Sequence, residues 1–168
     1  MNLALYLRCS IAAFALAGLA PSAHAQAVST TFQANAKVVK SLQLTAKQNL
    51  DFGTITLSGT PGTYTVAISQ AGTMTCPSGA TCAGTVRQAI MNVQGSNAQV
   101  VRITVSSINL VNAATGGTIP FVPDAPATIT LTNSGSPGRD FNIGGSLAVP
   151  STADGTYTGN VSVTVDYQ

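Results

Sequence analysis

The last fourteen residues, Gly155-Thr-Tyr-Thr-Gly-Asn-Val-Ser-Val-Thr-Val-Asp-Tyr-Gln168, carry the clearest pattern in the chain. Apolar and polar residues alternate up to Tyr167, and this period of two is typical of a β-strand with one buried face. We therefore expect a final strand over residues 156–167. One face of that strand carries Val161, Val163, Val165 and Tyr167, and the opposite face carries Ser162, Thr164 and Asp166.

Earlier segments show the same alternation. Segment 63–69 places Tyr64, Val66 and Ile68 on one face. Segments 85–93 and 99–108 flank a Gly-Ser-Asn sequence, which predicts a hairpin. The stretch 112–126 is rich in Gly, Pro and Ala and predicts a long connection. Short strands between turns, with no segment of helical periodicity, predict an all-β domain: an antiparallel β-sandwich of about seven to nine strands.

The composition argues against long charged helices and against nucleic-acid binding. Only 7% of the 168 residues are charged and the net charge is +2, whereas soluble domains average about 25% charged residues. Long charged helices are therefore not expected. The seven Lys and Arg residues are scattered and form no basic stripe, which argues against nucleic-acid binding.

The N-terminal segment reads as an export signal. A short region containing Arg8 precedes the apolar run 11–20, and Ala23-His24-Ala25 has the form of a signal-peptidase site. We predict cleavage after Ala25, which leaves a single domain over residues 26–168. No second segment of membrane length follows. The mature protein is thus expected in the periplasm and then at the cell surface or outside the cell.

Catalytic and metal-binding groups are scarce. The mature chain has no His and no Glu, so the common general bases are missing, and its two cysteines are too few for the four ligands of a zinc site; we predict neither enzyme activity nor a cofactor. Gly144-Gly-Ser-Leu-Ala148 departs from the nucleophile-elbow pattern at its last residue. Cys76 and Cys82 flank a short loop, and in an exported protein this pair predicts a disulfide.

The segment 32–39 also alternates, with apolar Phe32, Ala34, Ala36 and Val38 between polar residues. This pattern leaves two alternatives open. The segment is either the first strand of its own domain or a donor strand that pairs with another molecule.

Several motifs resemble known families. Gly155 and Tyr167 match the C-terminal pattern of chaperone–usher pilus subunits, and the run from Phe32 into Leu50-Asp-Phe-Gly53 resembles archaic pilins and spore-coat-U-like domains. The mature chain as a whole resembles the exported proteobacterial proteins of the domain of unknown function 4402. The motifs that carry this resemblance are Ala34-Asn-Ala36, Leu50-Asp-Phe-Gly53, Phe141-Asn-Ile-Gly-Gly145 and Gly155-Thr-Tyr-Thr-Gly159.

The resemblance implies an Ig-like, pilin-like sandwich that lacks or exchanges one strand. Its open edge is filled by strand addition, first by a periplasmic chaperone and then, with an usher as a further partner, by a neighbouring subunit that replaces the chaperone. On this reading the donor residues are Phe32, Ala34, Ala36 and Val38. The chaperone-facing edge comprises Gly155, Val161, Val163, Val165 and Tyr167. The expected function is that of a subunit or minor component of a surface fibre; the alternative is a stand-alone secreted or envelope-associated module with an adhesive or binding role.

Overall fold

The computed structural model describes residues 26–168, and the predicted signal segment lies outside them. The chain divides between Ala36 and Lys37, and the compact unit comprises residues 37–168. All regular structure in the described chain is β-structure, in twelve strands. Within residues 26–168 there is no helix long and apolar enough to cross a membrane.

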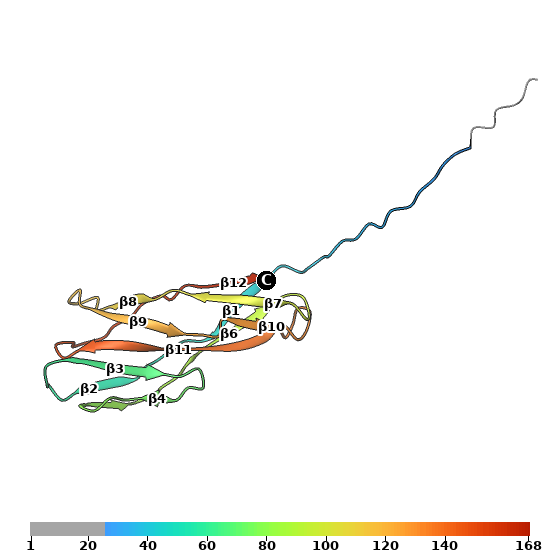
Figure 1. Ribbon diagram of the computed structural model, residues 1–168. Coiled ribbons are helices and arrows are strands. Elements are labelled where there is room, and N and C mark those ends of the chain that lie inside the picture. The colour runs from blue at the N-terminus through green and yellow to red at the C-terminus, as the bar shows by residue number, and fades with distance from the viewer. Residues whose placement is uncertain (1–25) are drawn as a thin grey trace, which may run out of the picture. The chain divides into compact units, whose positions relative to one another are not determined.

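The largest sheet is organised around one long strand, β11 (Arg139–Pro150). Its first half pairs with β6 (Ala89–Gln94), and its second half lies between β3 (Thr63–Ile68) and β9 (Thr118–Asp124), as Figure 1 shows. The sheet is completed by strands that each pair with one of these: β1 (Gln43–Gln48) with β6, β4 (Met74–Thr75) with β3, and β8 (Ile108–Val111) with β9.

Two glycines let β11 change partners halfway along. A Cβ atom on Gly144 would collide with the carbonyl oxygen of Ile68, and one on Gly145 would collide with the ring of Phe121. Both neighbouring strands therefore approach the β11 backbone more closely than a side chain would permit. Glycine inside a strand commonly marks such a close approach.

Two smaller sheets complete the domain. The order of the three-stranded sheet is β10 (Thr128–Thr130), β7 (Val100–Val105) and β12 (Val163–Tyr167), and all its pairs are antiparallel. A separate ribbon pairs β2 (Thr54–Leu57) with β5 (Ala80–Ala83). Apolar residues of this ribbon, including Ile55 and Leu57, pack against the core.

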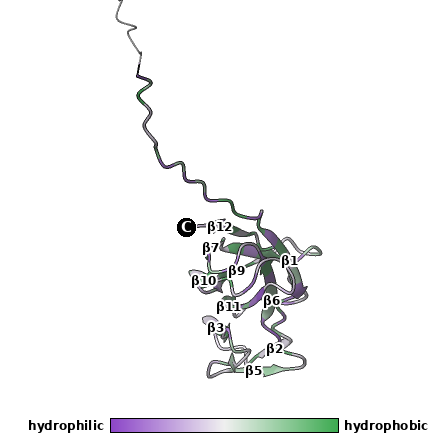
Figure 2. Ribbon diagram, turned by 90° about the vertical axis from the view of Figure 1, so that its right-hand side faces the viewer, coloured by the Kyte–Doolittle hydropathy of each residue, from purple (hydrophilic) through white to green (hydrophobic). Residues whose placement is uncertain are grey.

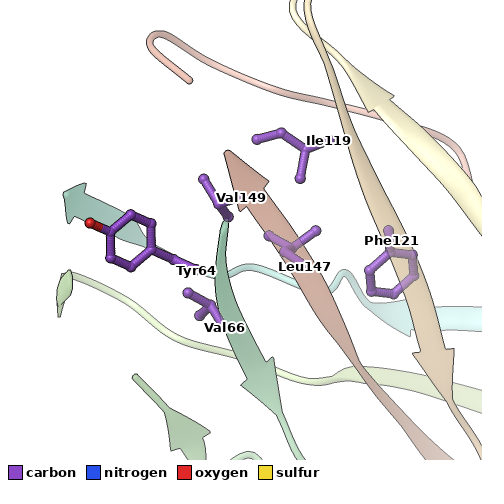
Figure 3. Packing of buried hydrophobic residues seen from close by; sticks show 6 residues of the cluster. All are labelled: Tyr64, Val66, Ile119, Phe121, Leu147 and Val149. Carbon is purple, nitrogen blue, oxygen red and sulfur yellow. The ribbon is translucent and has the colours of Figure 1, made fainter. Parts of the chain in front are cut away.

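The core consists of two clusters of buried side chains. Figure 3 shows the first cluster, in which Tyr64 and Val66 of β3 lie beside Leu147 and Val149 of β11, next to Ile119 and Phe121 of β9. The second cluster contains Val93, Val101, Ile103, Leu131, Phe141 and Ile143. The predicted inward residues of segment 63–69 are thus confirmed, with Val66 completely buried.

The predicted all-β sandwich class is confirmed, but some strand assignments are wrong. Segments 85–93 and 99–108 do not form a hairpin, because β6 and β7 belong to different sheets. The stretch 112–126 is not a long connection, because it contains β9. The final strand begins at Val163, and the part before it forms only an isolated bridge between Thr158 and Val111. The structure has twelve strands, more than the predicted seven to nine, because several of them have only two to four residues.

Candidate functional site: the free edge of β12 and the N-terminal segment

The C-terminal strand β12 lies at the edge of its sheet. It pairs with β7 on one side, in the register Val163↔Val105 to Tyr167↔Val101, and has no strand on its other side among the described residues. An unpaired edge presents a row of free backbone N–H and C=O groups that can bind another strand. The chain therefore offers a template for strand addition at its C-terminus.

The direction of the backbone groups on β12 follows from the ladder. The N–H of Gln168 donates to the carbonyl of Val100, and the carbonyl of Ser162 accepts from Ser106, so the even-numbered residues bond toward β7. In an antiparallel pair the residues between them point their N–H and C=O groups the other way. The free backbone groups of Val163 and Val165 thus face the open edge.

The side chains at this edge are incompletely covered. Val163, Val165 and Tyr167 are half-buried and pack against the second core cluster, whereas Val161 packs against the first. Leu44, on the edge strand β1 of the large sheet, is also half-buried against the second cluster. Edge strands of both sheets thus contribute partly exposed apolar side chains to one core. Polar residues occupy much of β1, whose ribbon is largely hydrophilic in Figure 2.

A ring of hydrogen bonds ties the base of the N-terminal segment to the end of β12. The Tyr167 hydroxyl donates to the carbonyl of Lys40 (2.6 Å) and accepts from the Ser96 N–H (2.8 Å). The Lys40 N–H in turn donates to Ser96 Oγ (2.7 Å). A side chain on Gly95 would collide with the Tyr167 hydroxyl, so this glycine makes room for the ring. We call Lys40, Ser96 and Tyr167 the tail clasp.

The alternating segment before the clasp forms no strand. Phe32 and Val38 are 89% and 90% exposed, and Ala34 and Ala36 are exposed as well. The first of the two alternatives for residues 32–39, a strand within the same domain, is therefore not found in the structure. The first strand is β1, which begins at Gln43.

Gly155 lies outside the edge itself. It occupies a turn ahead of β12 with φ of +95°, and a Cβ there would approach the Asn112 amide nitrogen to 2.6 Å. Asn112 is buried, donates to the carbonyl of Asp154 (2.9 Å), and accepts from the Ala114 N–H (2.9 Å). Gly155 thus closes a turn on a buried asparagine.

Sequence reasoning missed Asn112, Lys40 and Ser96. Asn112 carries a partial signal, because an Asn at the start of a Gly-rich stretch often folds back on the following backbone. The clasp residues carry none, since their partners are distant in the sequence.

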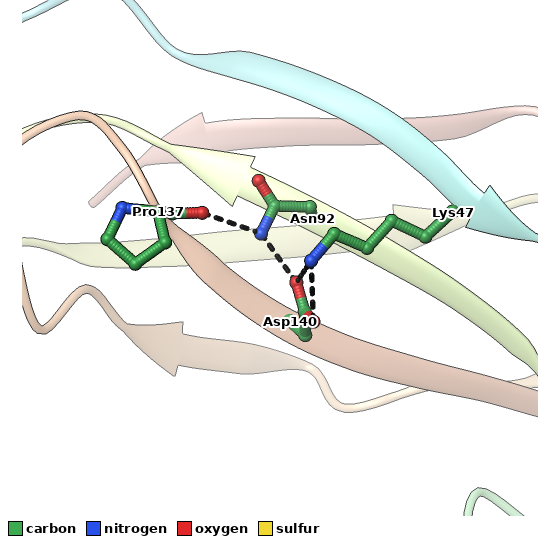
Figure 4. A network of polar contacts seen from close by, with 4 residues as sticks. All are labelled: Lys47, Asn92, Pro137 and Asp140. Carbon is green, nitrogen blue, oxygen red and sulfur yellow. Dashed lines mark hydrogen bonds and ion pairs between the residues drawn. The ribbon is translucent and has the colours of Figure 1, made fainter.

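A polar network crosses three neighbouring strands of the large sheet, β1, β6 and β11. Figure 4 shows Lys47 of β1 bound to Asp140 of β11, and Asn92 of β6 donating to both Asp140 and the carbonyl of Pro137. The Lys47 hydrogen bond, followed by that from Asn92, holds the pKa of Asp140 below its usual range, although desolvation opposes this. Next to Lys47 is an open polar hollow of about 570 Å³ that Asp51 and Arg87 also line.

The remaining predicted site is the cysteine pair. The sulfur atoms of Cys76, directly after β4, and Cys82, within β5, are joined at 2.03 Å, so the predicted disulfide is present. Within residues 26–168, no three His, Cys, Asp or Glu side chains are close enough to hold a metal ion together.

These features define a class: an all-β sandwich domain with a free C-terminal edge strand and an unpaired alternating N-terminal segment. The chain belongs to the family described as "Domain of unknown function (DUF4402)", whose model matches residues 42–167. No curated protein and no solved structure matches the chain. The matched region begins just after the tail clasp residue Lys40 and ends at Tyr167.

Proposed function

We propose that this protein is an exported structural subunit that assembles by β-strand addition. The segment Phe32–Val38 of one copy adds to the free edge of β12 in another copy, and repeated addition builds a surface fibre. One observation carries the proposal: within residues 26–168, an alternating apolar segment has no strand partner and the edge strand β12 is paired on one side only.

The side chains of the two elements are complementary. A strand over residues 32–38 places Phe32, Ala34, Ala36 and Val38 on one face. Added beside β12, these side chains would lie on the core-facing side of the sheet, next to the half-buried valines of β12. Fully burying an exposed side chain such as Phe32 or Val38 contributes about 1.5–3 kcal/mol each. Ala34 and Ala36, in the middle of the segment, are small and need only shallow space beside β12. This fits an edge whose valines already cover part of the core.

The tail clasp links strand direction to the form of the assembly. The segment ends at Lys40, which lies beside Tyr167 at the C-terminal end of β12. If the segment paired with β12 of the same chain, the two strands would therefore run parallel. Parallel addition to another copy brings the two roots together and closes a reciprocal dimer. Antiparallel addition places the two roots at opposite ends of β12, which is compatible with a third copy joining and with an open chain of subunits. Antiparallel pairing is also the slightly more stable kind, and we propose it here.

An unfilled edge with exposed apolar residues is an aggregation hazard. The proposal therefore includes an escort during export. In keeping with the resemblance to chaperone–usher subunits, we propose that a periplasmic chaperone covers β12 until an usher directs exchange for the next subunit.

Assembly is tested on material sheared from the source cells and run in detergent with and without boiling. Strand-exchanged copies should give a ladder of multiples that collapses to one band on boiling. Ala34→Asp with Ala36→Asp should abolish the ladder, because the carboxylates would face the core. The matched variant Asn35→Asp, on the other face, should retain it. A single unboiled monomer band from cells that export the wild-type protein would refute assembly and favour a stand-alone binding module.

Direction is tested by disulfide cross-linking. We take a register in which Asn35 lies opposite Thr164. Antiparallel pairing then places Gln33 opposite Asp166, whereas parallel pairing places Lys37 opposite Asp166. Disulfides form only between Cα atoms about 4.4–6.8 Å apart. Gln33→Cys combined with Asp166→Cys should therefore cross-link copies into a boiling-resistant ladder. Efficient cross-linking by Lys37→Cys with Asp166→Cys instead would contradict antiparallel addition.

A further inference from the structure

Strand β1 is a second open edge on the same core as β12. It is the outermost strand of the large sheet, and within residues 26–168 it pairs only with β6. It has six residues, whereas the edge strands β4, β8 and β10 and both strands of the β2–β5 ribbon have two to four. Its Leu44 packs on the second core cluster, as Val163 and Val165 of β12 do. By length and by position, β1 therefore competes with β12 for an added strand.

A subunit with two receiving edges would not build a linear fibre. Each copy carries one proposed donor segment, Phe32–Val38, so in a linear chain each copy receives one donor. A copy that received one donor at β12 and another at β1 would join two chains, and the assembly would branch. The proposed function, on which this inference rests, therefore needs one of the two edges to be closed.

The β1 edge is irregular. In the β1–β6 ladder Met91 pairs with Ala46, and the next residue back along β6, Ile90, pairs with Gln48. Lys47 therefore has no partner residue on β6 and forms a β-bulge. A bulge bends its strand and disrupts the even row of N–H and C=O groups that a further strand needs. The uninterrupted part of β1 is thus confined to residues 43–46.

The β12 edge has no such interruption. Its register with β7 is continuous from Val163 to Tyr167. Backbone hydrogen bonds extend this ladder at both ends, through the carbonyl of Ser162 and the N–H of Gln168. The regular edge from Ser162 to Gln168 is as long as the donor segment Phe32–Val38, and residues 43–46 of β1 are not. A full-length donor strand therefore fits β12 alone.

Side-chain contacts fix the bulge in place. Lys47 reaches across β6, and its ammonium nitrogen lies 2.8 Å from each carboxylate oxygen of Asp140 on β11 (Figure 4). The side chain of the next residue, Gln48, donates to the carbonyl of Gln88 (2.7 Å). Lys47 and Asp140 are 49% and 47% exposed, and ion pairs this exposed add little stability. The bulge is thus better explained by the pairing that it prevents than by the energy of its ion pair.

We propose that the β-bulge at Lys47 closes the β1 edge to strand addition and directs every donor segment to β12. The ammonium of Lys47 adds to this effect, because a strand added to β1 would cover part of a charged side chain. The fibre stays linear because each copy then offers one receiving edge.

The first experiment deletes Lys47 and images fibres sheared from cells that export the chain. Deletion leaves the pairs Ala46–Met91 and Gln48–Ile90 in place and joins them into one regular ladder, so the domain should still fold. Electron microscopy should show branched fibres for the deletion variant and unbranched fibres for the wild type. Lys47→Ala is the matched control, because it removes the ammonium and keeps the extra residue. Its fibres should remain unbranched.

Cross-linking then shows which edge a donor occupies. Thr45→Cys on β1 is combined in turn with Gln33→Cys, Asn35→Cys and Lys37→Cys. These three donor residues would share the outer face of the sheet with Thr45, so the one that lies opposite it can form a disulfide. In a chain that retains Lys47, no combination should cross-link copies above the level of the single-cysteine variants. In the deletion variant at least one should.

The outcomes separate the closed edge from strand addition itself. Cross-linking through Thr45→Cys in a chain that retains Lys47 overturns the proposal and leaves strand addition intact, whether or not the deletion variant folds. A folded deletion variant with unbranched fibres and no cross-link at β1 overturns it too. Branching in Lys47→Ala would assign the closure to the charge and refute the role of the bulge. If Gln33→Cys with Asp166→Cys gives no ladder either, strand addition fails and the closed edge fails with it.

Discussion

Removing the hydroxyl of Tyr167 tests whether the tail clasp holds the N-terminal segment at the end of β12. In Tyr167→Phe the ring can keep its place against the second core cluster, on which Leu42 also packs. Two hydrogen bonds are lost, one to the Lys40 carbonyl at 2.6 Å and one from the Ser96 N–H at 2.8 Å. Each intramolecular hydrogen bond contributes about 0.5–1.5 kcal/mol net.

The exposures of the two partners refine this magnitude. Lys40 is exposed, so water can replace the hydroxyl at its carbonyl, whereas Ser96 is half-buried and its N–H is harder to hydrate. We therefore expect a loss of about 1–2 kcal/mol in the free energy of unfolding. For a domain of this size the loss lowers Tm by about 3–6 °C. The N–H groups of Lys40 and Ser96 should also exchange with solvent faster than in the wild type.

The assay is urea unfolding followed by circular dichroism, with hydrogen exchange read at single amides. Tyr157→Phe is the matched control, because Tyr157 is also half-buried and the described structure gives its hydroxyl no hydrogen bond. If Tyr167→Phe is no less stable than Tyr157→Phe, and exchange at Ser96 is unchanged, the clasp does not hold the segment. The N-terminal segment would then have no fixed root at the end of β12, and its direction along a neighbouring strand would not be constrained.

Three further predictions concern the domain itself. Replacing both Cys76 and Cys82 by Ser should lower the free energy of unfolding by about 2 kcal/mol, the chain-entropy value for a loop this short. If the wild type unfolds at the same denaturant concentration with and without reductant, this prediction is wrong. Asn112→Ala should lower the free energy of unfolding by about 1–3 kcal/mol, because the Asp154 carbonyl and the Ala114 N–H lose their hydrogen-bond partner beside a buried site. An unchanged unfolding midpoint would show that this turn does not depend on the asparagine. Asp140→Asn should be less stable than the wild type near neutral pH, and the difference should vanish in acid. The folded pKa is lowered, so the stabilisation is complete above the unfolded pKa of about 3.9 and is lost as pH falls through the folded value; a gap that widens in acid would reverse this assignment.

Side-chain periodicity predicted well which residues of a strand face the core. Segment 63–69 and the alternating valines of the C-terminus contact the core as expected, because burial of one face is a local property of the sequence. Strand partners are not local. The Gly-Ser-Asn sequence between β6 and β7 turns the chain equally well within one sheet or across to the other. The structure takes the second course, with Ala98 at a φ of +57°.

The prolines in residues 112–126 led to the prediction of a connection where the structure has β9. Pro120 and Pro123 argue against a strand, yet β8 pairs only with residues 118–121 and β11 only with residues 121–124. Each half of β9 therefore has a side without a partner. Alternate residues of a strand point their nitrogens to opposite sides, so both prolines can face the side where no ladder bond is lost. Knowing this requires the three-strand register, which no local pattern contains.

The same limit explains the segment 32–39. Alternation in a sequence says which side chains a strand would bury, and it says nothing about which strand is the partner. In a domain that is complete within one chain, an alternating segment and a free edge strand would be expected to pair with each other. Here the two coexist unpaired, although the clasp roots the segment beside the end of β12. Pairing within the chain would have to be parallel, and pairing between copies is free to be antiparallel. The position of Lys40 beside Tyr167 is thus the feature that favours assembly between molecules over closure within one.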